Sequence, residues 1–452
     1  MKREETSEKK SIRTAGEAGW HISGYNLKLK VPDSHDTVIV NLYKGTCAVY
    51  NPIEMFLLSI LSELKEDHPI IPRFADRGII ANFDERSALE AMARGGCMFF
   101  SDISLTICPT MSCNFDCPYC FEDHREGKMS AGVQDDVVAL AERLLDFSGA
   151  KSLRISWYGG EPLLAADVIE SLSQRLIKLA DKKGVSYGAS IVTNGYLLTS
   201  ENIDMLVKSE VSSAQITLDG VGDVHDLTRH LAGGGPTFRR IIDNISNNKI
   251  PFKISIRHNV HKDNLNEING LRGLIERISE ESGNDLKYYP SPVRDNDAAA
   301  RRGKQVNLLC GSDMHDIDIL KDSAPFFAGR GVHCVANMGL SMCIDDRGNL
   351  LKCWDDVDKA DRSFGNVAGW DPEDPIGTAT SPDNLTSYLN TSGALDDPEC
   401  QECIWLPACA GGCPHQRLYY ERSCIPFKDC PEEYVLALYR RMNERTQQQK
   451  SV

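Results

Sequence analysis

The residues best suited to chemistry in this chain are three closely spaced cysteines, Cys113, Cys117 and Cys120, separated by three and by two residues. Three thiolates at this spacing can hold three irons of a [4Fe–4S] cluster, and a fourth protein thiolate would close the cluster. A set of three leaves one iron open for a substrate or cofactor. Cys108 is an alternative ligand, and a zinc loop or buried thiols are the competing interpretation. The strand that precedes these cysteines favours the iron–sulfur site.

A second group of cysteines follows in the C-terminal third of the sequence. Its members are Cys334, Cys353, Cys400, Cys403, Cys409, Cys413 and Cys430, with Gly348 between the first two. The chain has 16 cysteines in all, and its charged start, MKREETSEKK, lacks the apolar core of a signal peptide. Disulfides belong to oxidising compartments, so metal ligation is the better explanation. Zinc remains an alternative for the paired cysteines.

The composition is that of an ordinary globular protein, with 41% hydrophobic and 25% charged residues among 452. This excludes a disordered chain, a coiled coil and a collagen-like repeat. The net charge of -15 argues against nucleic acid as a partner. No run of about 18 apolar residues is present, so no membrane-spanning helix and a cytoplasmic location are expected.

The middle of the chain, residues 100–295, must position the first cysteine group. Apolar runs that suit strands alternate with amphipathic helical segments, which predicts an α/β fold with a parallel sheet and right-handed crossovers. Six repeats are too few for a closed eight-stranded barrel, so a partial (β/α)6 TIM-like barrel is expected, with its chemistry at the carboxyl ends of the strands. The predicted strands are 103–107, 153–157, 189–193, 214–218, 252–260 and 286–289.

The flanking regions predict smaller units. Residues 1–20 read as a tail, and 21–95 as a small α+β, winged-helix-like module that ends at Gly95-Gly96. In this module Asn51 is the expected N-cap of a helix that runs to about Lys65, with Phe56 on its inner face. Residues 296–435 form a cysteine-rich extension with a hairpin at 340–353, and 436–452 a final helix or tail.

The Cys113–Cys117–Cys120 motif after the first strand resembles that of the radical S-adenosylmethionine (radical SAM) enzymes. In that family the open iron is chelated by S-adenosylmethionine, which an electron from the cluster cleaves to a 5′-deoxyadenosyl radical. The resemblance therefore makes the three cysteines catalytic as well as metal-binding. It also implies a flavodoxin- or ferredoxin-type electron donor.

The resemblance continues around the barrel. A Gly-Gly-Glu turn would bind the methionyl amino group, a Thr-Asn pair the ribose and a tyrosine the adenine. An arginine on the fifth strand could reach the cofactor carboxylate, with a salt-bridged strand residue as the equal alternative. These residues are Tyr119, Gly159, Gly160, Glu161, Thr193, Asn194 and Arg257.

The segment that begins at Gln215 and contains Asp219, His225, Arg229 and Thr237 looks like a stretch of the peptide-modifying members of this family. Asp219 follows a strand, where it could position the substrate or act as a base. A carboxylate that caps the next turn is the structural alternative.

The C-terminal cysteines resemble the SPASM extension, which holds two auxiliary [4Fe–4S] clusters, so three clusters are implied in total. One ligand set would be Cys400, Cys403, Cys409 and Cys430. The other would be Cys334, Cys353 and Cys413, with Cys343 or Cys310 as a candidate fourth ligand or an open iron. Cys424 has no counterpart in the signature, and Cys47 and Cys97 read as core thiols.

The first 95 residues resemble the leader-recognition modules of peptide-maturing enzymes, which bind a peptide as an added strand. The resemblance thus implies a maturase that cross-links a ribosomally made precursor peptide, through a Cys thioether or a carbon–carbon bond. Sulfatase maturation, the oxidation of Cys or Ser to formylglycine, is the alternative reaction. A non-catalytic zinc or electron-carrier protein is the alternative of another class.

Overall fold

The computed structural model describes residues 19–31, 34–98, 102–293, 306–307, 334–390, 395, 397–420, 422 and 424–450. The chain forms two compact units. We call the first the terminal unit, made of Met1–Met98, Gly311–Cys334 and Thr391–Val452. The second, the sheet unit, comprises Phe99–Cys310 and Val335–Asn390. No helix among the described residues is both long and apolar enough to cross a membrane.

The sheet unit is built on parallel strands that follow one another in space as they do in the sequence. Each strand pairs with the next in parallel, which confirms the predicted α/β fold and all the predicted strands. The strands are β6 (Asp102–Ile107), β7 (Ser152–Trp157), β8 (Ser186–Thr193), β9 (Val211–Leu218), β10 (Lys253–Val260) and β11 (Leu286–Pro292).

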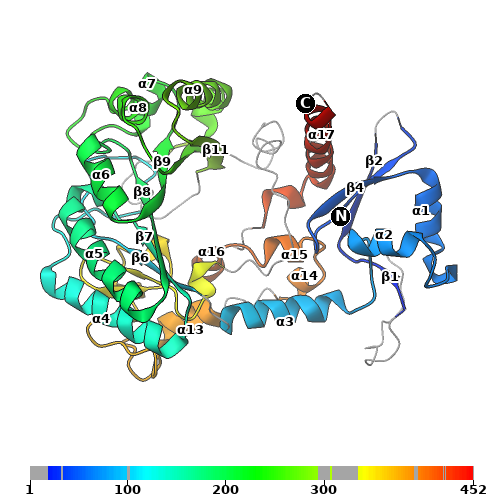
Figure 1. Cartoon of the computed structure of the whole chain (residues 1–452), viewed down its shortest axis with the longest axis horizontal. Helices are drawn as coiled ribbons and strands as arrows, with labels where there is room; N and C mark the ends of the chain where they lie inside the picture. The colour runs from blue at the N-terminus through cyan, green and yellow to red at the C-terminus, as the bar shows by residue number, and fades with distance from the viewer. Residues whose placement is uncertain are drawn as a thin grey trace. The chain divides into compact units, whose positions relative to one another are not determined.

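The helices between these strands cover one side of the curved sheet (Figure 1). They are α4 (Ala131–Ser148), α5 (Ala166–Lys183), α6 (Ser200–Lys208), α7 (Asp223–Thr228), α8 (Phe238–Asn247) and α9 (Glu267–Ser282). Helix α4 shows why they form. The side chain of Ser130 accepts a hydrogen bond from the backbone N–H of Val133 at the N-cap, and Gly149 ends the helix in a left-handed conformation.

The two faces of the parallel sheet differ in polarity. The helix-covered face is apolar and fully buried, as at Ile155 and Ile191. The opposite face carries hydroxyl groups: Ser156 and Ser190 are half-buried and lie side by side in register. Since successive strand residues point to opposite faces, this alternation leaves a polar inner surface for a site.

The predicted hairpin forms and extends the same sheet. Strand β12 (Met342–Ile344) pairs in parallel with β6, and β13 (Asn349–Leu351) and β14 (Gly365–Asn366) add antiparallel strands at that edge. Helix α13 (Pro382–Asn390) completes the unit. The attachment of the hairpin to β6 was not predicted, because backbone pairing at a sheet edge leaves no pattern in the side chains.

The terminal unit contains a three-stranded antiparallel sheet of β2 (Asn26–Lys30), β3 (Thr37–Asn41) and β4 (Thr46–Tyr50). A short pair, β1 (His21–Ile22) with β5 (Ile80–Ala81), lies apart from it in the sheet order. The remaining N-terminal elements are the helices α1 (Pro52–Ser59), α2 (Ile70–Asp76) and α3 (Glu85–Met98).

Two expectations for this module are wrong. Asn51 does cap α1, in a capping box with Glu54, but the helix ends at Ser59, and Phe56 is 61% exposed while Leu58 is buried. The pair Gly95-Gly96 lies inside α3, near Met98, where both that helix and the N-terminal part of the terminal unit end. Glycine weakens a helix by only about 1 kcal/mol, so the flanking helical residues can carry the helix through the pair.

The three-stranded sheet is covered on both faces. Ile39 and Tyr50 pack with the α1–α2 side chains Leu58 and Phe74. On the other face, side chains of β2 and β3 share a core with the C-terminal segments. Those segments include α14 (Pro398–Gln401), α15 (Leu406–Cys409) and α17 (Pro431–Lys450). Helix α16 (Pro414–Tyr419) lies between α15 and α17 in the sequence. The N-terminal module therefore completes its core with residues from the far end of the chain.

Candidate active site

The first cysteine group lies in the loop that follows β6, at the carboxyl end of the parallel sheet. Cys117 is buried, and Cys113 and Cys120 are half-buried. The backbone of the loop is held by the segment that precedes α8: Phe115 bridges Leu231, and the Ala232 N–H donates to the Asn114 carbonyl at 2.8 Å. These bonds fix the loop independently of its thiols.

The three thiols are close enough to influence one another. Burial is the largest cause that raises the pKa of each, and the Cys117 and Cys113 thiols add to the raised pKa of Cys120. Among the described residues, no three Cys, His, Asp or Glu side chains are close enough to hold a single metal ion. In a [4Fe–4S] cluster each thiolate binds a different iron.

Gly159 and Gly160, at the end of β7, form a cradle for the start of this loop. The Gly160 N–H donates to the Thr110 carbonyl at 3.3 Å. A Cβ at Gly159, whose φ is +111°, would lie 2.3 Å from that same carbonyl oxygen, and a Cβ at Gly160 would lie 2.3 Å from the Ser112 carbonyl oxygen. Only glycine permits this approach of two backbones.

Glu161 ties the ends of three structural segments together. Its buried carboxylate accepts hydrogen bonds from the Thr193 hydroxyl at 2.7 Å and from the Asn194 N–H at 2.7 Å. The Asn194 amide in turn donates to the Asn114 side chain, between the first two cysteines, at 2.8 Å. Burial raises the pKa of Glu161, while these bonds oppose the rise. Asn114 is a site residue that sequence reasoning missed, although it lies within the cysteine motif.

A second buried network joins the cysteine loop to the end of β9. The Tyr119 hydroxyl donates to Asp219 Oδ2 at 2.5 Å, Arg229 donates to the Tyr119 oxygen at 2.9 Å, and the Thr228 hydroxyl donates to the same Asp219 oxygen at 2.7 Å. The other oxygen, Asp219 Oδ1, is buried without a partner among the described residues. Burial raises the pKa of Asp219, and Arg229 limits the rise. A buried acceptor without a hydrogen-bond partner is suited to accept a hydrogen bond from a ligand.

The segment after Asp219 holds it in place. The Asp219 N–H donates to His225 Nδ1 at 3.2 Å, and the Asn264 amide donates to the Asp219 carbonyl at 2.7 Å. The Asp226 carboxylate accepts from the backbone N–H of Thr237 at 2.7 Å, which closes the loop. The residues that suggested a peptide-modifying enzyme thus form a positioning shell around Asp219.

Arg257 lies on the polar inner face of the sheet, in register with Thr217 of β9 and Tyr289 of β11. It is half-buried, and its Nε donates to Asn259 Oδ1 at 2.8 Å on the same strand. The Nε atom of Arg257 therefore bonds to an amide oxygen and not to a carboxylate. Its proposed contact with a cofactor carboxylate stays a prediction.

The hairpin brings another pair of cysteines into the sheet unit. Cys343 is 1% exposed and packs in an apolar cluster with Cys108 and Tyr158. Cys353 is half-buried, and next to it the Trp354 ring lies 4.7 Å from that of Tyr158. Burial and Asp355 raise the pKa of Cys353, and Cys343 adds to the rise.

The predicted auxiliary set of Cys334, Cys353 and Cys413 draws on both units. Cys334 is exposed and Cys413, the N-cap of α16, is half-buried, both in the terminal unit. Their joint ligation with Cys353 stays a prediction. Cys310 and the side chain of Cys97 lie outside the described residues, and Cys47 is buried in the terminal core, as expected.

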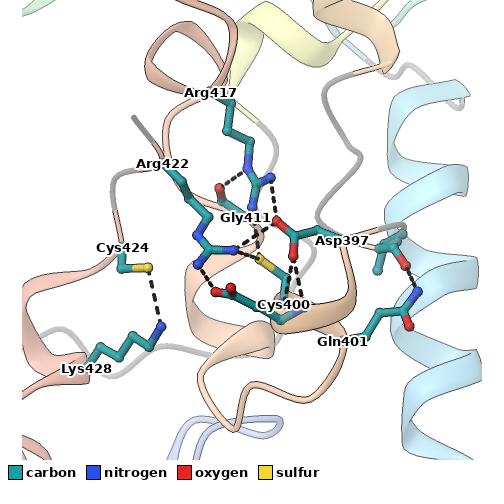
Figure 2. A network of polar contacts seen from close by, with 10 residues as sticks. Asp397, Cys400, Gln401, Gly411, Arg417, Arg422, Cys424 and Lys428 are labelled. Carbon is teal, nitrogen blue, oxygen red and sulfur yellow. Dashed lines mark hydrogen bonds and ion pairs between the residues drawn. The ribbon is translucent and has the colours of Figure 1, made fainter. Parts of the chain in front are cut away.

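Four further cysteines line a hollow in the terminal unit, and Cys430 is buried in the core of that unit. The hollow has a volume of about 340 Å³, including space open to solvent, and its lining includes Cys400, Cys403, Cys409 and Cys424. Figure 2 shows the guanidinium groups of Arg417 and Arg422 converging on Asp397 and Cys400. The Arg417 Nη2 lies 2.9 Å from the Cys400 sulfur. Such contacts suit a negatively charged thiolate site.

The fold and the cysteine loop define an enzyme that uses S-adenosylmethionine for radical chemistry, and the comparison with known families agrees. Residues 107–274 match the model of the radical SAM superfamily. The chain therefore has a radical SAM domain, which confirms the resemblance seen in the sequence, and its cofactors are S-adenosylmethionine and the [4Fe–4S] cluster of that domain. It is an enzyme, so the interpretation as a non-catalytic protein is wrong.

Curated relatives extend the similarity beyond this domain. The chain is 27% identical over 342 residues to the Fe-coproporphyrin III synthase of Methanosarcina barkeri, covering 67% of this chain and 80% of that protein. It is 23% identical over 342 residues to a cysteine-type anaerobic sulfatase-maturating enzyme of Clostridium novyi, covering 69% and 87%. These relatives have different substrates.

Solved structures share the fold. Native anSMEcpe with bound AdoMet and Cp18Cys peptide matches with a TM-score of 0.57 at 20% identity, covering 77% of this chain and 99% of that one. Streptococcus suis SuiB bound to S-adenosylmethionine matches with a TM-score of 0.50 at 17% identity, covering 89% and 98%. At these identities the likeness shows the fold alone.

Proposed function

We propose that this radical SAM enzyme modifies a ribosomally made precursor peptide by forming a cross-link, first of all a thioether from a Cys of the peptide. A carbon–carbon bond is the variant of the same reaction. The observation that carries the proposal is the three-stranded sheet of the terminal unit, which offers a strand edge to a peptide in the same chain as the radical SAM domain.

The two edges of that sheet are not equivalent. Edge strand β2 carries Lys28 and Lys30, and charged side chains on an edge discourage pairing with another strand. Edge strand β4 reads Thr-Cys-Ala-Val-Tyr, has no charge and pairs only with β3 among the described strands. A leader peptide that adds as a strand would therefore bind along β4, where backbone hydrogen bonds provide affinity.

The chemistry needs a protected site for the cofactor. When bound through Cys113, Cys117 and Cys120, the cluster would supply the electron that cleaves S-adenosylmethionine, with a flavodoxin- or ferredoxin-type protein as its source. Glu161 holds the ends of β7 and β8 together, where the cofactor would bind. Asp219, whose pKa is raised by burial, can hold a proton or accept a hydrogen bond from the substrate.

Sulfatase maturation is the second candidate, and a specific observation favours it. Two kinds of relative, the Clostridium novyi enzyme and a serine-type enzyme of Klebsiella aerogenes, are anaerobic sulfatase-maturating enzymes. The anSMEcpe neighbour binds a peptide as well. Both candidates thus share a peptide substrate and differ in the bond that is made.

Mass spectrometry of the product separates the two. The enzyme is reduced and incubated with S-adenosylmethionine and, in parallel, with a Cys-containing sulfatase peptide and with cysteine-rich peptides encoded beside its own gene. A cross-link removes two hydrogens and keeps the sulfur, whereas formylglycine formation from Cys removes the sulfur. If neither class of peptide is modified although 5′-deoxyadenosine accumulates, the proposal of a peptide substrate is wrong.

The leader-binding role is tested with one charge placed on either edge. Val49 on β4 and Leu29 on β2 are both partly buried against the same core, so Val49→Lys and Leu29→Lys are a matched pair. We expect Val49→Lys to weaken binding of a fluorescent precursor peptide about tenfold, and Leu29→Lys to leave binding unchanged, with uncoupled cleavage of S-adenosylmethionine retained in both. Equal affinity in the two variants would show that the precursor peptide does not bind along β4.

A further inference from the structure

The carboxyl ends of β9 and β10 bring a buried histidine, His261, close to Asp219. Thr217 of β9 lies opposite Arg257 of β10 on the polar inner face of the sheet. Since inward positions recur at every second residue, Asp219 and His261 continue that face beyond the two strands. The backbone of His261 is extended, with φ -138° and ψ 175°, so the alternation holds there. Both side chains are buried.

One buried amide holds the backbones of the two residues side by side. The Asn264 side chain donates to the Asp219 carbonyl oxygen at 2.7 Å and accepts from the His261 N–H at 2.8 Å. His258 Nε2 lies 3.2 Å from the same carbonyl oxygen, and because a carbonyl only accepts, this nitrogen donates. These contacts fix the two strand ends through their backbones, which leaves the side chains of Asp219 and His261 available to a ligand.

Each of the two side chains has a polar atom that is not used. Asp219 Oδ1 and His261 Nε2 are buried, and neither has a hydrogen-bond partner among the described residues. Burial raises the pKa of Asp219, and His261 is one of the groups that oppose the rise, so the two side chains lie within electrostatic reach of each other. Buried polar atoms are rarely left unpaired, so two of them at one edge of the sheet indicate a position for a polar ligand.

The other ring nitrogen of His261 lies near a carboxylate. His261 Nδ1 is 3.5 Å from Asp263 Oδ2, and the Asn307 amide donates to the Asp263 carboxylate at 2.9 Å. This hydrogen bond, with His261 as a further cause, lowers the pKa of Asp263. An ionised carboxylate beside Nδ1 favours the tautomer with its proton there, which leaves Nε2 as an acceptor. The other titratable groups that interact with His261 include Asp219 and His258.

Asp219 is less suited than an imidazole to remove a proton from a thiol. Its Oδ2 atom already accepts from Tyr119 and Thr228, and although burial raises its pKa, Arg229 limits the rise. These contacts stabilise the ionised carboxylate and make it a weak base. An imidazole exchanges its proton near neutral pH, which matches it better to a thiol with a pKa of about 8.5.

We propose that His261 is the general base that removes the proton from a Cys thiol of the peptide substrate through Nε2, while Asp219 Oδ1 accepts a hydrogen bond from the same peptide. The S–H bond breaks, an N–H bond forms at Nε2, and the sulfur keeps the electron pair as a thiolate, the nucleophilic form of Cys. Asp263 stabilises the imidazolium ion that results. No electron leaves the peptide in this step. The proposal rests on a Cys-containing peptide as the substrate.

The test compares His261→Gln with the exposed His35→Gln on the Cys peptide that the unmodified enzyme converts. A thiol with a pKa of about 8.5 is about 3% ionised at pH 7 and about 90% ionised at pH 9.5, so a base matters only at the lower pH. We expect kcat/KM of His261→Gln to be about 30-fold below that of the unmodified enzyme at pH 7 and within about threefold at pH 9.5. His35→Gln should match the unmodified enzyme at both pH values.

Three outcomes would overturn the role of His261. Two of them are no loss in His261→Gln at pH 7 and a loss of equal size at both pH values, which would indicate a structural role. The third is that the unmodified enzyme forms 5′-deoxyadenosine but converts no peptide, which overturns the peptide substrate and this role with it. The first two leave the peptide substrate intact, so the two failures can be told apart.

A second measurement covers the case in which circular dichroism shows that His261→Gln does not fold. The unmodified enzyme is given the same peptide with selenocysteine in place of Cys, because a selenol is already ionised at neutral pH and needs no base. We expect kcat/KM for the two peptides to change in parallel between pH 7 and pH 9.5. A value for the Cys peptide that rises about 30-fold over this range, while that for the selenocysteine peptide stays constant, would show that no enzyme base acts on the thiol.

Discussion

The cysteine loop of the sheet unit and that of the terminal unit place the same residue type in different electrostatic surroundings. In the first, burial and neighbouring carboxyl or thiol groups raise the pKa of Cys113 and Cys120. In the second, burial raises the pKa of Cys400 but Arg417 opposes the rise, and Lys428 lies beside Cys424. Nearby cations make a cluster easier to reduce, because they stabilise the added electron.

This difference indicates different roles. We expect a cluster in the first loop to be the stronger reductant, which suits the cleavage of S-adenosylmethionine. The second loop, with cations on its sulfurs, suits a cluster that accepts and stores electrons or stabilises the fold. The following experiments test how far the two loops differ.

The largest effect is expected from the first loop. Replacing Cys113, Cys117 and Cys120 together by Ala should abolish the formation of 5′-deoxyadenosine from S-adenosylmethionine and dithionite, and remove about one cluster's iron, because these cysteines are the predicted ligands of the cluster with the open iron. Liquid chromatography measures the product. Cys108→Ala is the matched control, since Cys108 is buried nearby. If Cys108→Ala alone abolished the reaction, Cys108 would be a ligand after all.

A smaller effect is expected from the network behind this loop. Glu161→Gln keeps the shape of the side chain but presents an NH2 group to the N–H of Asn194 and the hydroxyl of Thr193. One unsatisfied buried group costs about 1–3 kcal/mol, so we expect affinity for S-adenosylmethionine to fall roughly 5- to 150-fold. Equilibrium dialysis measures the affinity. The exposed Glu280→Gln is the control, and equal affinity in both variants would contradict the role of Glu161.

The buried shell around Asp219 predicts a pH dependence of stability. Burial lowers the pKa of His258 to about 4, and burial likewise holds the pKa of His225 well below its usual value. The unfolded chain then binds more protons than the folded one below about pH 6.5, so the unfolding free energy should fall as the pH drops from 6.5 toward 4. For His258 alone the loss is about 2 kcal/mol at pH 5.

Urea unfolding at several pH values measures this slope. His258→Gln should flatten it, leaving the part due to His225, while the exposed His35→Gln should not change it. A slope identical to that of the unmodified protein in His258→Gln would mean that His258 is charged in the folded state.

The smallest effect is expected in the second loop. Lys428→Met removes the ammonium group 3.6 Å from the Cys424 sulfur. If a cluster binds there, its one-electron potential should fall by about 10–40 mV, the equivalent of roughly 0.2–1 kcal/mol for a partly exposed charge. Redox titration followed by electron paramagnetic resonance measures the shift, with the exposed Lys178→Met as control. A potential that did not move would place Lys428 outside the reach of the cluster.

Much of the sheet unit could be predicted from the sequence, because its strands and helices depend on local patterns. Strands such as β7 have fully apolar outer positions, and α4 has a visible N-cap at Ser130. The cysteine motif could be recognised for the same reason, since its residues are close in the sequence. The hydrogen bonds between Asn194 and Asn114 and between Tyr119 and Asp219 could not be predicted, because many residues of chain separate the two members of each pair.

The terminal unit was harder to predict. Its core joins Leu27 and Val40 to Trp405 and Leu438. Neither segment has a sequence pattern that predicts its contact with the other. The side chains of Cys424 and Cys430 are also only six residues apart, so spacing cannot decide which of them faces the hollow. Burial in three dimensions distinguishes them: Cys424 is exposed and Cys430 is in the core.

The shared core of the terminal unit has a consequence for the order of events during synthesis. Leu27 leaves the ribosome long before Leu438, its partner in this core. At about 5–20 residues per second, the N-terminal sheet waits roughly 20–80 s for the segment that covers its second face. The sheet unit, which ends at Asn390, is synthesised completely before α17, whereas the second face of β2 and β3 stays uncovered until the C-terminal segments are made. The N-terminal sheet can therefore complete its core only at the end of synthesis.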